Sequence, residues 1–186
     1  MNFRGEKRRN DTHVSTTDPE AKLARKGRGK EAKLSFSMHS LMENRNGLLV
    51  DIRVDAADGV AERYNAIAML EDNVPGSTRI TVAGDKGYDD ATFVEACRTR
   101  NITPHVAQNI ARPGGSAIDG RTTRVPGYQV SQRVRKRVEE IFGWFKTVGG
   151  FRRTRFRGQA RTQMAAYVVG AAYNLTRMLR LCASGP

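Results

Sequence analysis

The sequence has little cysteine, little histidine and no long hydrophobic run, and each shortage excludes a class of protein. Two cysteines, Cys97 and Cys182, cannot build a disulfide framework or a four-ligand zinc site, so both are predicted to be reduced, buried thiols. The three histidines are scattered and suggest no metal centre. No apolar run approaches the ~18 residues of a membrane span, and residues 1–10 are too polar for a signal peptide. The 186 residues therefore predict one soluble domain of cytoplasmic type.

Negative charge is scarce in one part of the chain. Against 32 Lys and Arg there are 19 Asp and Glu, which leaves a net charge of +13. Residues 121–161 hold twelve basic side chains and only Glu139 and Glu140, a net charge of +10, whereas residues 31–120, with nine basic and thirteen acidic, carry −4. This local excess favours a phosphate-rich partner, with an acidic protein or an anionic membrane surface as the alternatives.

The hydrophobic pattern predicts an α/β order of elements. Residues 1–32 show no apolar period and are predicted to be a basic arm. The rest, residues 33–183, is predicted to be one domain in which Asn46-Gly47 joins two strands as a hairpin. The predicted strands span 33–41, 48–54, 79–83 and 102–106, the predicted helices span 60–70, 90–99, 131–147 and 162–183, and a basic loop spans 107–130.

The helix predicted over residues 131–147 has two different faces. With about 100° per residue, an apolar stripe predicts the core side of this helix, and it consists of Val134, Val138, Ile141 and Phe145. A neighbouring face holds Arg135, Glu139 and Lys146, so Glu139 lies beside the core boundary. Glu140 points away and has the spacing of an ordinary surface pair with Lys136. The two glutamates are therefore expected to have different roles.

Two carboxylates in a basic setting are typical of metal-assisted phosphoryl transfer on DNA. Asp85 follows the strand predicted at 79–83, and Glu139 lies on the later helix. Mg²⁺ prefers such oxygen ligands together with water and phosphate, and Lys and Arg neutralise the DNA backbone. The plainer alternatives are that Asp85 forms a turn and that Glu139 is a solvated helix residue.

Two motifs resemble the bacterial insertion-sequence DDE transposases of groups four and five. They are Gly84-Asp85-Lys86-Gly87-Tyr88-Asp89 and the run from Arg135 to Gly150, RKRVEEIFGWFKTVGG. Residues 3–8 and 15–21 are also similar to the linker of that family. The resemblance implies a ribonuclease H-like (retroviral-integrase-like) fold, a mixed sheet flanked by helices. It also implies that Asp85 and Glu139 are catalytic and bind Mg²⁺ or Mn²⁺.

The sequence departs from that family in two places. Gln132 stands where the helix signature of the family has a Tyr that contacts the DNA end. The first catalytic Asp of the family lies on the first strand of the fold, and nothing before Phe3 can supply it. We therefore expect a chain that lacks the first strand, an N-terminally truncated transposase. Asp11 and Asp51 are the weak candidates to replace the missing carboxylate.

The sequence thus predicts a DNA transposase domain that binds double-stranded DNA, namely terminal inverted repeats and target DNA. A homo-oligomer on DNA and a location in the cytoplasm at the bacterial nucleoid follow from the resemblance. The predicted DNA-binding residues are Arg135, Lys136, Lys146, Arg152, Arg153, Arg155 and Arg157. Two alternatives stay open: a catalytically inactive DNA-binding remnant, and an unrelated basic scaffold that binds RNA or an acidic protein.

Overall fold

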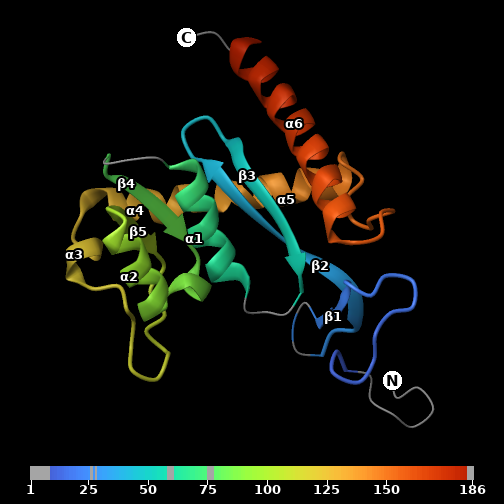
Figure 1. Ribbon diagram of the computed structural model, residues 1–186. Helices are drawn as coiled ribbons and strands as arrows, with labels where there is room; N and C mark the ends of the chain where they lie inside the picture. Colours follow the sequence, from blue (N-terminus) through green and yellow to red (C-terminus); the bar gives the residue numbers. More distant parts are fainter. Residues whose placement is uncertain (1–8, 26, 28, 58–60, 75–77, 184–186) are drawn as a thin grey trace.

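The strands form two separate sheets, one antiparallel and one parallel (Figure 1). The computed structural model describes residues 9–25, 27, 29–57, 61–74 and 78–183. The antiparallel sheet has the order β1 (Lys22–Arg25), β2 (Ala32–Glu43) and β3 (Leu48–Ala56). The parallel pair is β4 (Ile80–Gly84) with β5 (Ile102–Val106). The α/β class is confirmed, whereas the predicted mixed sheet is divided in two within the described residues.

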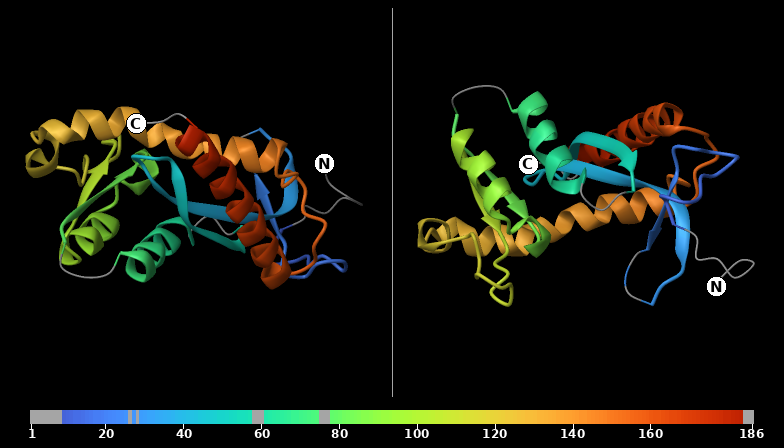
Figure 2. Two further views of the ribbon diagram at one scale, coloured as in Figure 1. Left: turned by 90° about the horizontal axis from the view of Figure 1, so that it is seen from above. Right: turned by 60° about the horizontal axis from the view of Figure 1, so that its bottom comes forward.

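Helices connect and cover the two sheets. A continuous helical run follows β5, passes beside both sheets and carries Glu139, as Figure 2 shows. The helices are α1 (Ala61–Asn73), α2 (Ala91–Thr99), α3 (Gly120–Thr123), α4 (Pro126–Val134), α5 (Val138–Thr147) and α6 (Gln159–Ala183), with the 3₁₀ turns η1 (Lys86–Tyr88) and η2 (Arg135–Arg137). No helix in these described ranges is both long and apolar enough to cross a membrane.

Several sequence predictions are confirmed within one or two residues. The β2–β3 hairpin turns at Gly47, whose φ of 72° suits glycine, and the Gly47 N–H donates to the Glu43 carbonyl at 3.0 Å. Asp90 caps α2 by accepting from the N–H groups of Thr92 and Phe93. The strand predicted at 102–106 is observed over the same residues.

Other boundaries differ from the prediction. The arm predicted at residues 1–32 contains β1, which pairs antiparallel with the start of β2. The loop predicted at 107–130 contains α3 and the start of α4, because Pro126 occupies the first turn of that helix, where its missing N–H costs no bond. The helix predicted from residue 131 thus begins at residue 126 and tightens to a 3₁₀ turn at 135–137.

Two hydrophobic clusters lie under the two sheets. The first joins α2 to β5 and includes Phe93, Cys97 and Val106. The second packs α5 and α6 on β3, with Ile141 and Phe145 fully buried, which confirms the predicted core stripe. Burial raises the pKa of the Cys97 thiol to about 12. Cys182, predicted to be buried, is exposed near the end of α6.

Helix α6 packs on β3 through small and amide side chains together with Tyr173, while most of its large apolar side chains are exposed. A Cβ at Gly170 would lie 2.7 Å from Leu49 Cδ2, so any other residue there would displace the Leu49 side chain. Gln163 bonds both the Val54 N–H and the Ile52 carbonyl, and Asn174 bonds both backbone groups of Leu49. These amides satisfy the outer edge of β3, which would otherwise be unpaired.

Methionines at helical spacing in the helix predicted at 162–183 are expected to be core residues, and this expectation is wrong. Their face of α6 is an exposed apolar stripe, and the C-terminal half of the helix projects beyond the sheets in Figure 1. The stripe is defined here as Met164, Tyr167, Val168, Leu175, Met178 and Leu179, of which each is 45% exposed or more.

Candidate active site and nucleic-acid interface

Asp85 is exposed at the carboxyl end of β4 and forms the turn that follows. Its Oδ1 accepts a hydrogen bond from the Gly87 N–H at 2.7 Å, and a Cβ at Gly87 would lie only 2.9 Å from that oxygen. Within the described residues Oδ2 has no hydrogen-bond partner. Asp85 therefore does form a turn, which was the plainer alternative for this residue. Only one of its two carboxylate oxygens is used in that turn.

Helix α1 fixes the Asp85 turn from the other side. The Tyr88 hydroxyl donates to Glu62 at 3.2 Å, and Arg63 Nη1 donates to the Gly87 carbonyl at 3.3 Å. Burial and the neighbouring Glu62 carboxylate raise the pKa of Tyr88, so this hydroxyl stays protonated. The turn that carries Asp85 is thus held both by its own hydrogen bond and by two hydrogen bonds with side chains of α1.

Glu139 lies in the first turn of α5 and is exposed. Its carboxylate makes no hydrogen bond or ion pair with any described residue. The apolar side of the same helix is anchored by Ile141 and Phe145, both 0% exposed. A rigid helix therefore presents a carboxylate that nothing in the described fold uses.

The two carboxylates have the chemistry of ligands for a divalent cation. Asp85 and Glu139 offer carboxylate oxygens, the ligands that Mg²⁺ and Mn²⁺ take together with water and substrate phosphate. The described residues contain no group of three or more His, Cys, Asp or Glu side chains placed to hold a metal ion. Two carboxylates fit such an ion only if phosphate or a further carboxylate completes its ligands.

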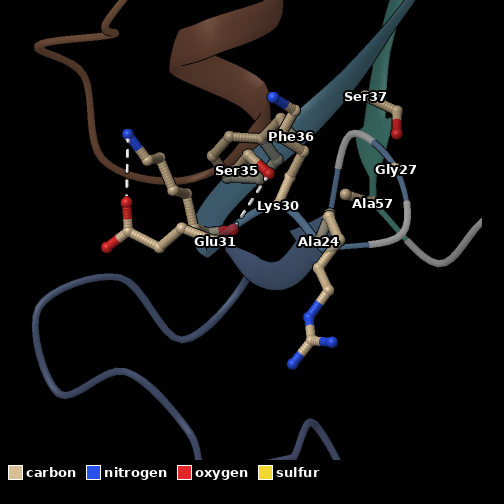
Figure 3. A pocket seen from close by; sticks show the side chains of 10 residues that line it. Ala24, Gly27, Lys30, Glu31, Ser35, Phe36, Ser37 and Ala57 are labelled. Carbon is tan, nitrogen blue, oxygen red and sulfur yellow. Dashed lines mark hydrogen bonds and ion pairs between the residues drawn. The ribbon is translucent and has the colours of Figure 1, made fainter. Parts of the chain in front are cut away.

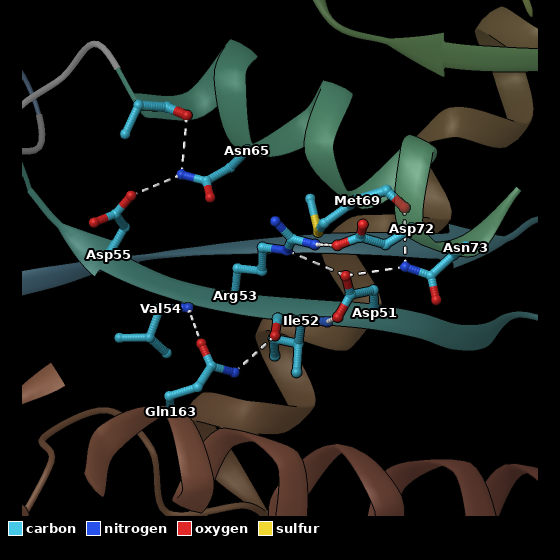
Figure 4. Close-up of polar contacts among 11 residues, drawn as sticks. Asp51, Ile52, Arg53, Val54, Asp55, Asn65, Met69, Asp72, Asn73 and Gln163 are labelled. Carbon is cyan, nitrogen blue, oxygen red and sulfur yellow. Dashed lines mark hydrogen bonds and ion pairs between the residues drawn. The ribbon is translucent and has the colours of Figure 1, made fainter. Parts of the chain in front are cut away.

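Asp51, a candidate to replace the missing carboxylate, is fully used by the fold (Figure 4). Its Oδ1 accepts from the Ile52 N–H at 2.7 Å, and its Oδ2 accepts from Arg53 Nε at 3.2 Å and from Asn73 Nδ2 at 3.1 Å. These bonds join β3 to α1. Asp11, the other candidate, lies in a turn at residues 10–12, outside both sheets.

Asp89 has a structural role that the sequence reading missed. Its side chain is buried, with 2% exposure, and its two oxygens accept the N–H groups of Asn109 at 2.6 Å and Ala117 at 2.9 Å. Its carbonyl accepts from Arg112 Nη1 at 2.8 Å. The only signal in the sequence was the pair Asp89-Asp90, since one aspartate suffices to cap α2.

Gln132, which stands at the Tyr position of the resembling family, faces protein. Its Nε2 donates to the His105 carbonyl at 2.8 Å, and its Oε1 accepts from Arg135 Nε at 3.1 Å. Ser131 Oγ bonds His105 Nδ1 at 2.7 Å beside it, and burial lowers the pKa of His105. Position 132 therefore anchors the helix to β5 and orients Arg135.

The other predicted DNA-binding side chains are exposed and unpaired. Within the described residues no hydrogen bond or ion pair engages the side chains of Lys136, Lys146, Arg152, Arg153, Arg155 and Arg157. Arg133 and Arg161, which the sequence reading left out, are in the same state. Trp144 packs against protein, with its ring centroid 5.5 Å from that of Tyr173.

One comparison with known proteins gives a match. A family model described as the transposase DDE domain matches residues 11–175 of the 186-residue chain. No curated protein and no solved structure matches the chain. The matched range includes both carboxylates and all of the unpaired cations named above.

Proposed function

Since this chain belongs to the transposase DDE domain family, we propose that it is a domain that binds double-stranded DNA for transposition, with the terminal inverted repeats and the target as its substrates. The observation that carries this proposal is the state of Glu139. It is exposed and unpaired, on the same helical run as Lys136 and Lys146 and just before the arginines at 152–157. A polyanion that binds these cations would lie beside a free carboxylate.

In this proposal Asp85 and Glu139 are metal ligands and catalytic residues. A bound Mg²⁺ or Mn²⁺ would activate the attacking oxygen and stabilise the leaving oxygen of a DNA strand. The chain itself contributes the positions of the two carboxylates and the cations that hold the phosphates. The bond from the Gly87 N–H fixes the rotamer of Asp85, and Ile141 and Phe145 fix the helix that carries Glu139.

The fold proposed for the complete enzyme is ribonuclease H-like, as in insertion-sequence groups four and five. In that complete enzyme a further strand would lie between the β2–β3 ribbon and the β4–β5 pair, join them into one sheet and supply the first catalytic aspartate. The separation of the two sheets and the engagement of Asp51 support this part of the proposal. The nucleotide sequence upstream of the Met1 codon tests it: an in-frame strand with Asp-Gly supports a longer enzyme, and a stop or frameshift supports a truncated one.

The test of function is a nicking assay on duplex DNA that carries terminal-repeat sequence. Mn²⁺-dependent nicking that disappears in both Asp85→Asn and Glu139→Gln, with folding and DNA binding retained, is the expected result for an active domain. Lys146→Ala is the matched control from the same helix, and it should weaken binding but keep nicking at saturating protein. Nicking that survives both carboxylate substitutions would contradict the roles of Asp85 and Glu139.

A second candidate function is a DNA-binding remnant without catalysis. It is favoured by one observation, namely that the described residues assemble no group of three metal-ligating side chains. This candidate predicts salt-sensitive binding of terminal-repeat DNA without nicking in any metal. If RNA binds better than DNA and terminal-repeat DNA binds no better than random DNA, both candidates are contradicted.

The proposal includes a homo-oligomer, for which the apolar stripe of α6 is the natural surface. Six large apolar side chains at helical spacing stay exposed over most of the helix. Such a patch usually marks an interface. Sedimentation of the unmodified chain should show a species larger than a monomer, and Val168→Lys with Leu175→Lys should return it to a monomer. A monomer at all concentrations, with and without DNA, would contradict this.

A further inference from the structure

A basic groove lies beside the β1–β2 hairpin. It has a volume of about 940 Å³, and its lining includes the cationic side chains Arg25, Lys30 and Lys33 and the hydroxyls of Ser35 and Ser37 (Figure 3). Neither the family match nor any motif found in the sequence assigns a role to this groove.

The electrostatic balance of the groove is positive. Its one lining carboxylate, Glu31, is already paired with Lys33 Nζ at 3.4 Å. The side chains of Arg25 and Lys30 make no hydrogen bond or ion pair in the part of the chain that the structure describes. Two cations are thus left without a counter-charge from the described residues, and a phosphate-bearing ligand would supply one.

The segment before this hairpin is fastened to the end of the arginine-rich loop at residues 152–157. Asp18 Oδ2 accepts the Gly158 N–H at 3.1 Å, and the Glu20 carboxylate accepts the Gln159 N–H. Both bonds satisfy backbone donors at the start of α6, where acidic groups are favoured. Both carboxylates keep their negative charge, so their contribution is to position the loop.

The groove and the loop lie at the same end of the β2–β3 ribbon. Ala57, directly after β3, lines the groove, and Gln159 Nε2 donates to the Val54 carbonyl at 3.0 Å near the same strand end. Figure 1 and Figure 2 show the segment that precedes β1 next to the loop that precedes α6. The carboxylates of Asp18 and Glu20 hold this arrangement together.

We propose that the hairpin groove and the 152–157 loop form one surface that binds the sugar–phosphate backbone of duplex DNA. This inference rests on the proposed function and adds a second contact region, remote in sequence from α5. Arg25 and Lys30 bind phosphates, Lys33 exchanges its pairing with Glu31 for a phosphate, and Ser37 offers a hydroxyl donor. Charge complementarity favours DNA over an apolar or basic partner.

The test measures the affinity of the full chain for a labelled duplex over a series of salt concentrations. The Arg25→Ala/Lys30→Ala variant should bind on the order of tenfold more weakly at about 100 mM salt, with a log–log salt slope smaller by nearly 0.9 per lost contact. Arg45→Ala/Arg79→Ala removes the same charge from the β2–β3 turn and the start of β4, and it should bind like the unmodified chain. Arg25→Lys/Lys30→Arg should restore binding.

A second variant tests whether the groove and the loop act as one surface or whether net charge alone attracts the DNA. Asp18→Ala/Glu20→Ala raises the net charge by two, so simple attraction predicts tighter binding, whereas loss of the clamp predicts weaker binding despite the added charge. Tighter binding would contradict the shared surface. Urea unfolding of each variant confirms that the chain remains folded.

The outcomes distinguish this inference from the proposed function. If the unmodified chain fails to bind duplex DNA, the proposed function itself fails. If it binds and the groove variant equals the Arg45/Arg79 control, only the groove is excluded. If the groove substitutions weaken binding of duplex RNA but not of duplex DNA, the assignment of DNA to this surface is wrong.

Discussion

Two arginine-rich regions of this molecule are used in opposite ways. Between residues 98 and 121 each arginine has an acidic partner, since Arg98 and Arg121 pair with Asp119, Arg100 with Glu71 and Arg112 with Asp90. Between residues 133 and 161 no basic side chain forms an ion pair with a described residue, and most of these side chains are exposed. We refer to these as the paired region and the unpaired region.

The comparison of the two regions shows which positive charges of the chain are available to bind a ligand. In the paired region carboxylates from α1, the start of α2 and the start of α3 neutralise the guanidinium groups and hold a loop in place. In the unpaired region only Glu139 and Glu140 are near in sequence, so the charge stays free. Substitutions in the paired region should therefore change stability, and those in the unpaired region should change DNA binding.

The largest effect on stability is expected for Asp89→Ala, next to the paired region. This change leaves the N–H groups of Asn109 and Ala117 without their acceptor in a buried site. Loss of such bonds costs about 1–3 kcal/mol of the free energy of unfolding, as measured by urea denaturation. Asp11→Ala, at an exposed turn, is the control. Equal stability of the two variants would contradict the role of Asp89 in holding the loop that contains Asn109 and Ala117.

A smaller loss is expected for Arg112→Ala. Arg112 donates to the Asp89 carbonyl at 2.8 Å and pairs with Asp90 at 3.6 Å, and its side chain is 45% exposed, so solvent screens the pair. We expect a loss of about 1 kcal/mol in urea denaturation. Because Asp89 and Arg112 hold the same loop, the double variant should lose less than the sum of the two single losses. Full additivity would show that they act separately.

The pairing of Asp119 predicts a dependence on pH. Its hydrogen bond with Arg121 lowers the pKa of Asp119 to about 2. A carboxyl whose pKa is lower in the folded state contributes stability above its ordinary pKa, near 3.8, and this contribution disappears as the pH falls to about 2. The difference in urea midpoint between the unmodified chain and Asp119→Asn should thus shrink between pH 4 and pH 2. A difference that stays constant would contradict this pairing.

The smallest effect on stability is expected in the unpaired region. Arg153 is exposed and has no partner among the described residues, so Arg153→Ala should change the free energy of unfolding by less than about 0.5 kcal/mol. A loss comparable to that of Arg112→Ala would mean that the loop at 152–157 is held by its arginines, and the comparison of the two regions would fail.

The sequence predicted the local elements well and their assembly less well. The alternating and helical patterns identified the β2–β3 hairpin, β5 and the buried stripe of α5, because each of these buries large apolar residues at the spacing of its element. It missed β1, because two of the four residues of the strand Lys22–Arg25 are basic and the strand is fixed by pairing with β2. It chose the wrong face of α6, because Gln163, Gly170 and Asn174 form the contact and carry no hydrophobic signal.

The candidate site shows a similar division. The positions of Asp85 after a strand and of Glu139 on a helix agree with the sequence reading, and their catalytic role stays a prediction. The roles of Asp89 and Gln132 depend on backbone groups of residues 105–117, which a single sequence does not reveal. Net charge alone also could not separate Arg121, which is paired, from Arg153, which is not.

The most direct test of the account compares two triple variants that lose the same charge. Arg152→Ala/Arg153→Ala/Arg155→Ala removes three cations from the unpaired region, and Arg100→Ala/Arg112→Ala/Arg121→Ala removes three from the paired region. In a salt titration of duplex DNA binding, the first should lower the log–log slope by nearly 0.9 for each of its contacts, and the second should leave it unchanged. Equal losses of slope in the two variants would show that net charge alone attracts DNA and would contradict a DNA-binding surface in the unpaired region.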